Sequence, residues 1–135
     1  PRGTLFRSTL LVGVYLTEVA GPDRGNLVVW PGSHRRYARF FRELDAPRFL
    51  VERGAEALLR EIQAFDAGEP RQLEVRPGDA VVAHHLLGHG TADNLSRQTR
   101  EAVYFRLLHP EDRASDPAPM LDESRFFSGL AFEDD

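Results

Sequence analysis

The chain has 135 residues, 41% of them apolar, and a formal net charge of −4. This size fits one domain, or part of one, with a real core, and the acidic balance disfavours nucleic acid or an anionic membrane as main partner. The chain has no cysteine, and arginine supplies all 17 basic residues, which excludes disulfides, thiolate catalysis and lysine Schiff bases. The lack of cysteine, of a signal peptide and of a membrane-length apolar run predicts a cytoplasmic protein.

Residues 8–17, STLLVGVYLT, form an apolar run of strand length. Because side chains alternate along a strand, Leu11, Gly13 and Tyr15 share one face. Both faces are apolar, so we expect this strand at the centre of a sheet and covered on each side. Gly13 would let a ligand or another backbone approach closely.

A short strand is predicted at residues 27–30, and Pro31-Gly32 suits the centre of a type II turn. Ser33 is a candidate N-cap for a following helix. His34 is interpreted as a turn or surface histidine rather than a ligand. The basic side chains of that helix suggest either a solvated face or a site for an anionic group, and they are Arg35, Arg36, Arg39 and Arg42.

A second helix is predicted to begin at Asp45-Ala46-Pro47 and to end at Ala67-Gly68. Its apolar residues recur at gaps of three and four, which indicates one buried face formed by Val51, Ala55, Leu58, Ile62 and Phe65. Gly54 inside this helix is expected to cost about 1 kcal/mol relative to Ala. Together the two helices predict a helical insertion at about residues 35–67, covering the outside of a sheet.

Further strands are predicted at residues 72–76, 79–87 and 100–108, followed by a loose tail at about 110–135. Leu73 and Val75 should point inward. Strict alternation would place His84 and His85 on opposite faces, with His85 on the side of His89. For both His84 and His85, a core histidine is the favoured interpretation.

His89 and Arg100 are the strongest candidate site residues. His89 follows one strand at the mouth of a polar loop, and Arg100 opens the next strand eleven positions later. If the loop folds the chain back, the two residues lie on neighbouring strands. An imidazole can ligate a metal, and a guanidinium can hold a carboxylate through two parallel hydrogen bonds. The pair therefore predicts a pocket for a metal and a small organic acid, with Arg106 as a less favoured carboxylate binder.

The segments GDAVVAHHLLGHGTADNLSRQTREAVYFRL and GNLVVWPGSHRR together resemble the phytanoyl-CoA dioxygenase family, which is similar to other Fe(II)- and 2-oxoglutarate-dependent oxygenases. The resemblance covers roughly residues 10–34 and 73–108. It implies that His89, which opens an H-G-[ST]-x-x-N motif, ligates iron. It also implies that Arg100 binds the far carboxylate of 2-oxoglutarate and that Thr91 adds a hydroxyl. The pocket residues expected on this hypothesis are Gly13, Tyr15, His85 and Asn94.

One part of the family pattern is missing. The family takes its other two iron ligands from an H-x-D or H-x-E motif shortly before the first predicted strand, and residues 1–8 contain neither a His nor an acid. We expect that the printed sequence begins just after this motif; a degenerate relative is the alternative. Five predicted strands, where a jelly roll needs about eight, point to the same missing N-terminal part.

The sequence thus predicts a mainly β fold, a double-stranded β-helix of the jelly-roll or cupin type with a helical insertion and without its N-terminal strands. Its open sheet edges would be covered by a missing segment or by a second copy of the chain. The predicted function is an Fe(II)- and 2-oxoglutarate-dependent dioxygenase that hydroxylates a small-molecule or lipid-like substrate. The alternative is a non-catalytic module on the same fold that binds a small acid.

Overall fold

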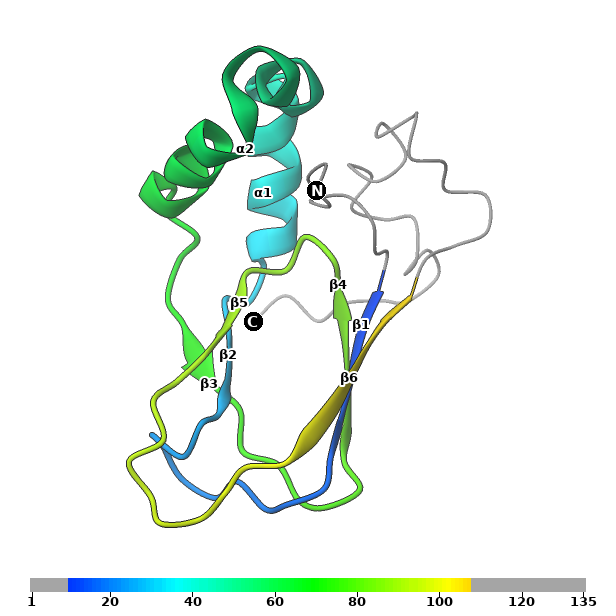
Figure 1. Cartoon of the computed structure of the whole chain (residues 1–135), viewed down its shortest axis with the longest axis vertical. Coiled ribbons are helices and arrows are strands. Elements are labelled where there is room, and N and C mark those ends of the chain that lie inside the picture. Colours follow the sequence, from blue (N-terminus) through cyan, green and yellow to red (C-terminus); the bar gives the residue numbers. More distant parts are fainter. Residues whose placement is uncertain (1–9, 108–135) are drawn as a thin grey trace.

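The computed structural model describes residues 10–107, which form six strands and two helices (Figure 1). In chain order they are β1 (Leu10–Tyr15), β2 (Leu27–Val29), α1 (Ser33–Glu43), α2 (Ala46–Ala64), β3 (Arg71–Gln72), β4 (Ala80–His84), β5 (His89–Thr91) and β6 (Ala102–Leu107). With helices of 11 and 19 residues, this part of the chain is mixed rather than mainly β as predicted. The tail predicted at about 110–135 lies outside the described residues.

The first sheet is antiparallel and has the order β4-β1-β6. The central place predicted for residues 8–17 is therefore confirmed. Leu11, Gly13 and Tyr15 form the buried face of β1, as their alternation requires. The opposite face is only half-buried, and Val82 beside it on β4 is 54% exposed. Among the described residues, β1 is thus fully covered on one side only.

The second sheet is also antiparallel and has the order β3-β2-β5. Val29 lies opposite His89 in this sheet, and Leu27 lies opposite Thr91. The sequence predicted a polar loop here, and that prediction was wrong because β5 is defined by its backbone pairing with β2 and not by a pattern of side chains. The strand predicted at 72–76 is also shorter, since Val75 makes only an isolated bridge with Val19.

The two sheets face each other across an apolar core (Figure 1). The buried residues of this core are Tyr15, Val19, Leu27, Val29 and Val75, with Leu73, Val81, Leu87 and Ala102 packed against them. Both sheets contribute to it, and Leu73 and Val75 point inward as predicted. A double-stranded β-helix would arrange two sheets in this way, and the complete barrel stays a prediction.

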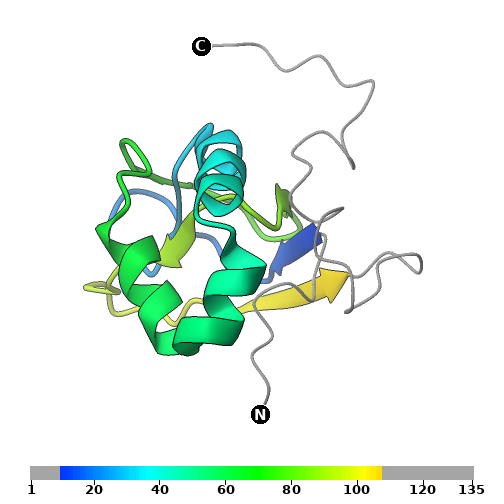
Figure 2. The ribbon, with the colours of Figure 1, turned by 90° about the horizontal axis from the view of Figure 1, so that it is seen from above.

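The helical insertion is present, but it lies beyond one end of the two sheets and not over the outside of either (Figures 1 and 2). The turn after β2 sends the chain in this direction. Gly32 has φ 73° and ψ −10°, and the Ser33 amide donates to the Trp30 carbonyl at 3.1 Å, which are the features of the predicted type II turn. Gly32, not Ser33, is the N-cap of α1. The helices have their own small core, made by Ala38, Phe41, Ala46, Leu58 and Leu86.

Gly54 divides α2 into two helical segments, because its φ of 83° and ψ of 167° are not helical. The predicted single apolar face is therefore wrong before Gly54. Val51 is 86% exposed, whereas Leu58 after the break is fully buried. Within the part of the chain that the structure describes, no helix is long and apolar enough to cross a bilayer.

Replacing Gly54 by Ala tests this break. In a straight helix Gly54→Ala would add about 1 kcal/mol of stability. At the observed φ and ψ, which almost only glycine adopts, we expect the free energy of unfolding to fall by about 1–3 kcal/mol. Urea denaturation followed by circular dichroism measures the change, and Arg53→Ala at the adjacent exposed position should change it by less than about 0.5 kcal/mol. A stabilised Gly54→Ala variant would contradict the break.

Candidate functional site

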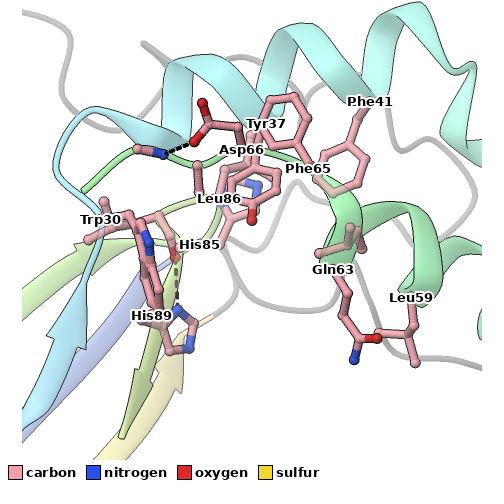
Figure 3. Close-up of a pocket in the computed structure, with 15 residues that line it drawn as sticks. Trp30, Tyr37, Phe41, Leu59, Gln63, Phe65, Asp66, His85, Leu86 and His89 are labelled. Carbon is pink, nitrogen blue, oxygen red and sulfur yellow. Dashed lines mark hydrogen bonds between the residues drawn. The ribbon is translucent and has the colours of Figure 1, made fainter. Parts of the chain in front are cut away.

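Two hollows meet the ends of β5. The first, of about 580 Å³, is lined largely by apolar side chains and includes His89, the first residue of β5 (Figure 3). The second, of about 430 Å³, is polar and includes Thr91, the last residue of β5. Arg100 lines the second hollow. The three-residue strand β5 therefore has an apolar pocket at its first residue and a polar pocket at its last.

The imidazole of His89 is held in a form that suits metal binding. Its Nδ1 lies 2.8 Å from the Leu87 carbonyl oxygen (Figure 3). Because a carbonyl only accepts, Nδ1 must carry the proton in this contact, and the lone pair of a neutral ring is then on Nε2. Within the described part of the chain, no hydrogen bond uses Nε2. A second hydrogen bond of this kind, to a backbone carbonyl, is what orients most metal-ligating histidines.

The residue before His89 is fixed by the turn after β2. The hydroxyl of Ser33, which is fully buried, accepts a hydrogen bond from the Gly88 amide at 2.8 Å. The Trp30 amide donates to the Gly88 carbonyl at 3.0 Å. Sequence reasoning missed this role because Ser before a helix is usually a cap. The signal was present in the sequence as the Pro-Gly-Ser turn directly after β2.

Arg100 is connected to the inner face of the first sheet through two tyrosines. Its Nη1 donates to the Tyr104 hydroxyl at 3.2 Å, and that hydroxyl lies 2.9 Å from the Tyr15 hydroxyl. Tyr104 can lie across β1 because its cross-strand neighbour is Gly13. A Cβ at Gly13 would stand 2.7 Å from Tyr104 Cε1, so any larger residue would displace the ring. A side chain therefore makes the close approach at Gly13, where the sequence predicted a ligand or another backbone.

The polar hollow surrounds the half-buried Arg100 with hydrogen-bonding groups. Its aliphatic part packs beside Gly25 and Asn94. The amide of Asn94 donates to the Gln98 carbonyl at 2.8 Å and accepts from the Ser96 amide at 3.0 Å, which holds the loop in shape. Among residues 10–107, no carboxylate forms an ion pair with Arg100. A guanidinium in this setting can receive a carboxylate through two parallel hydrogen bonds.

The predicted placement of His89 and Arg100 on neighbouring strands was wrong. His89 belongs to β5 in the second sheet, and Arg100 lies two residues before β6, a strand of the first sheet. Residues next to them nevertheless contribute to the core between the sheets. His89 is opposite the buried Val29, and Arg100 shares its face with Ala102, which is opposite Tyr15. The two residues line different hollows, one at each end of β5.

The other predicted site residues fall into three groups. Thr91 and Asn94 line the polar hollow with Arg100, and His85 lines the apolar hollow with His89. Tyr15 is fully buried behind Tyr104, so Tyr15 contacts a bound molecule only through Tyr104.

His84 and His85 do not point to opposite faces as predicted. The strand β4 ends at His84, and the Leu87 amide closes a turn by donating to the His84 carbonyl at 2.9 Å. The two rings are stacked, with centroids 4.4 Å apart. His84 is buried and its Nδ1 accepts from the Leu86 amide at 3.1 Å, which agrees with the predicted core role. His34 packs near it, with ring centroids 5.6 Å apart.

Comparison with known proteins identifies the family. Residues 2–102 match the family model of phytanoyl-CoA dioxygenase (PhyH). The chain belongs to this family. It is 34% identical over 101 residues to the "Phytanoyl-CoA dioxygenase, peroxisomal" of Mus musculus and, equally, to that of Rattus norvegicus. The matched part is 73% of this chain and 28% of each relative, so the chain spans little more than a quarter of their length. The resemblance drawn from the two sequence segments is confirmed, and the chain is related to dioxygenases at the family level.

Burial first, and then the hydrogen bond with Tyr104, raises the pKa of Tyr15 well above its ordinary value of about 10. The folded state thus favours the neutral phenol. Since a raised pKa means that the folded state holds its proton longer than the unfolded state does, this contribution to stability is complete below about pH 10 and is lost as the pH rises further.

The composition makes this loss measurable. The chain contains three tyrosines and neither lysine nor cysteine, so tyrosines are the only side chains that titrate near about pH 10. We expect the urea midpoint of the wild type to fall between about pH 9 and pH 11, and that of Tyr15→Phe to fall less. Circular dichroism and phenolate absorbance, recorded on the same samples, measure both events. Equal pH slopes in the two proteins would contradict a shifted Tyr15.

Proposed function

We propose that this chain carries the co-substrate anchor and one iron ligand of an Fe(II)- and 2-oxoglutarate-dependent dioxygenase that hydroxylates a small-molecule or lipid-like substrate. The observation that carries the proposal is the Arg100 guanidinium, which is half-buried, fixed by Tyr104 and without a carboxylate partner among residues 10–107. Membership of the phytanoyl-CoA dioxygenase family supports it.

At the co-substrate end, Arg100 would hold the far carboxylate of 2-oxoglutarate. 2-Oxoglutarate is a dicarboxylic keto acid, and its planar far carboxylate matches the fork of a guanidinium. Thr91 lines the same hollow and adds a hydroxyl donor. The Tyr104 hydroxyl accepts from Nη1 and so fixes the orientation of the fork before the acid binds. This pre-organisation lowers the entropic cost of binding.

At the metal end, His89 would ligate iron through Nε2, because Nδ1 is bonded to the Leu87 carbonyl. Among residues 10–107 no group of three His, Asp or Glu side chains could hold a metal. A triad of two His and one carboxylate therefore requires two ligands from outside residues 10–107. When bound, iron with 2-oxoglutarate and dioxygen supplies the oxidant for an unactivated C–H bond. The residues of this chain orient the ligands and limit the access of water.

Two further expectations stay predictions. The cytoplasmic location was inferred from composition, whereas the two relatives are named as peroxisomal proteins. We also expect a second copy of the chain or another segment to cover the open sheet edges. The edge strand β6 is where this cover is expected, because Val103, Phe105 and Leu107 are 43%, 49% and 47% exposed.

Substituting Arg100 tests the co-substrate site. We expect Arg100→Ala to weaken 2-oxoglutarate binding by about 2–4 kcal/mol, because the bound carboxylate would lose its partner. Arg106→Ala is the matched control, since Arg106 lies opposite Leu11 at the far end of β6 and should leave the affinity unchanged within about twofold. Isothermal titration calorimetry measures both. If 2-oxoglutarate affinity falls in Arg106→Ala and not in Arg100→Ala, the acid binds at the other end of β6 and the assignment to Arg100 is wrong.

Substituting His89 tests the metal site. Anaerobic titration of the protein with Fe(II) and 2-oxoglutarate should give the weak visible charge-transfer band of a chelated complex. We expect His89→Ala to abolish the band and His85→Ala, in the same hollow, to retain it. If the folded full-length protein, which includes the segment before this chain, binds 2-oxoglutarate but never shows the band, the non-catalytic acid-binding module is the function instead.

A further inference from the structure

The apolar hollow is a partly open pocket that is walled by side chains. It lies between α1, α2 and the turn before β5, and its volume of about 580 Å³ is within the range of pockets for small organic molecules. Figure 3 shows His89 and Trp30 at one end and Leu59 and Gln63 at the other. A molecule that fills the cavity would therefore extend from the helical insertion to the proposed iron ligand.

The walls of the cavity include several aromatic rings that pack against one another. The rings of Tyr37 and Phe65 have centroids 5.1 Å apart, and those of Tyr37 and Phe41 are stacked at 5.8 Å. Phe65 is in turn supported by Phe40 at 4.6 Å from outside the lining. Rings that are fixed in this way present apolar area without a further entropic cost when a ligand binds.

The charge of the cavity distinguishes it from the neighbouring hollow. Its lining contains no arginine, and its single carboxylate, Asp66, is 90% exposed and lies 4.0 Å from Arg36. The polar hollow, by contrast, is lined by Arg97 and Arg100. An anionic group would find hydrogen-bonding cations in the second hollow and none in the lining of the first. Removing such a group from water into the first hollow would be costly.

We propose that the apolar cavity binds the substrate that is oxidised, and that this substrate is an uncharged, largely apolar small molecule whose reactive carbon lies at the His89 end. The inference rests on the proposed function for the role of the molecule as substrate, but the binding itself requires neither iron nor 2-oxoglutarate. Each hollow thus has its own ligand. The keto acid is held by Arg100 in the polar hollow, and the neutral molecule packs against Trp30, Tyr37 and Phe65 in the apolar one.

A pair of fluorescent probes tests the chemistry of the cavity. N-phenyl-1-naphthylamine is neutral, and 8-anilino-1-naphthalenesulfonate has the same ring skeleton with an added sulfonate. We expect the 135-residue chain to bind the neutral probe saturably, with one site per chain. The sulfonate should bind at least about tenfold more weakly. Without added metal, saturating 2-oxoglutarate should leave the affinity for the neutral probe unchanged within about twofold, since Arg100, which would hold the acid, lines the other hollow.

Matched variants on α2 locate the site. Leu59 lines the cavity and is 46% exposed, so Leu59→Asp places a carboxylate in the wall without disturbing a buried position. It should weaken binding of the neutral probe about tenfold. Val51→Asp introduces the same charge on the same helix, at a residue that is 86% exposed and outside the lining, and should have no effect. Gln63→Arg should narrow the difference between the two probes by about two- to fivefold.

The outcomes separate this inference from the proposed function. Non-saturable binding, equal affinity for both probes, displacement by 2-oxoglutarate, or equal effects of Leu59→Asp and Val51→Asp would each overturn the inference. None of these results changes the iron and 2-oxoglutarate band. If the neutral probe binds as expected but the folded full-length protein shows no band, the cavity is retained and the oxygenase assignment fails. Arg100→Ala, which lies outside the lining of the cavity, should weaken 2-oxoglutarate binding and retain the probe.

Discussion

The pairing of β5 with β2 is the constraint on which the candidate site depends. Three residues of β5 place His89 opposite Val29 and Thr91 opposite Leu27, so one end of the strand reaches the apolar hollow and the other end the polar one. A slip of one residue would turn the side chains of His89 and Thr91 to the other face. The hydrogen bond from the Gly88 amide to the buried Ser33 hydroxyl fixes this register from outside the ladder.

The proposed metal ligand and the proposed carboxylate binder are positioned by different sheets. The second sheet carries the imidazole, whose proton position is set by the Leu87 carbonyl. The first sheet carries the guanidinium, whose orientation is set by Tyr104. Tyr104 in turn depends on a glycine opposite it and on the buried Tyr15 hydroxyl. Each of the two groups is thus oriented by a hydrogen bond to a neighbouring residue, which is how precise sites are built on rigid elements.

Local patterns in the sequence predicted the features that depend on local physics. The alternation in residues 10–15 gave the buried face of β1, and Pro31-Gly32 gave the turn before α1. The features that were missed depend on contacts distant in sequence. The β5 strand is defined only by its pairing with β2. The Ser33 hydroxyl accepts a hydrogen bond from the Gly88 amide, 55 positions away. The break at Gly54 interrupts an otherwise helical sequence pattern. His89 and Arg100 were found by motif and spacing, but their placement on facing sheets follows from the topology.

The central claim is that His89 and Arg100, from different sheets, hold opposite ends of one metal and keto acid complex. A crystal structure of the protein with Mn(II) in place of Fe(II), and with 2-oxoglutarate, tests it most directly. The account predicts the metal on Nε2 of His89 at about 2.0–2.3 Å and the far carboxylate of the acid on the Arg100 guanidinium. A metal bound without His89, or an acid held by Arg106 or by another cation, would contradict it.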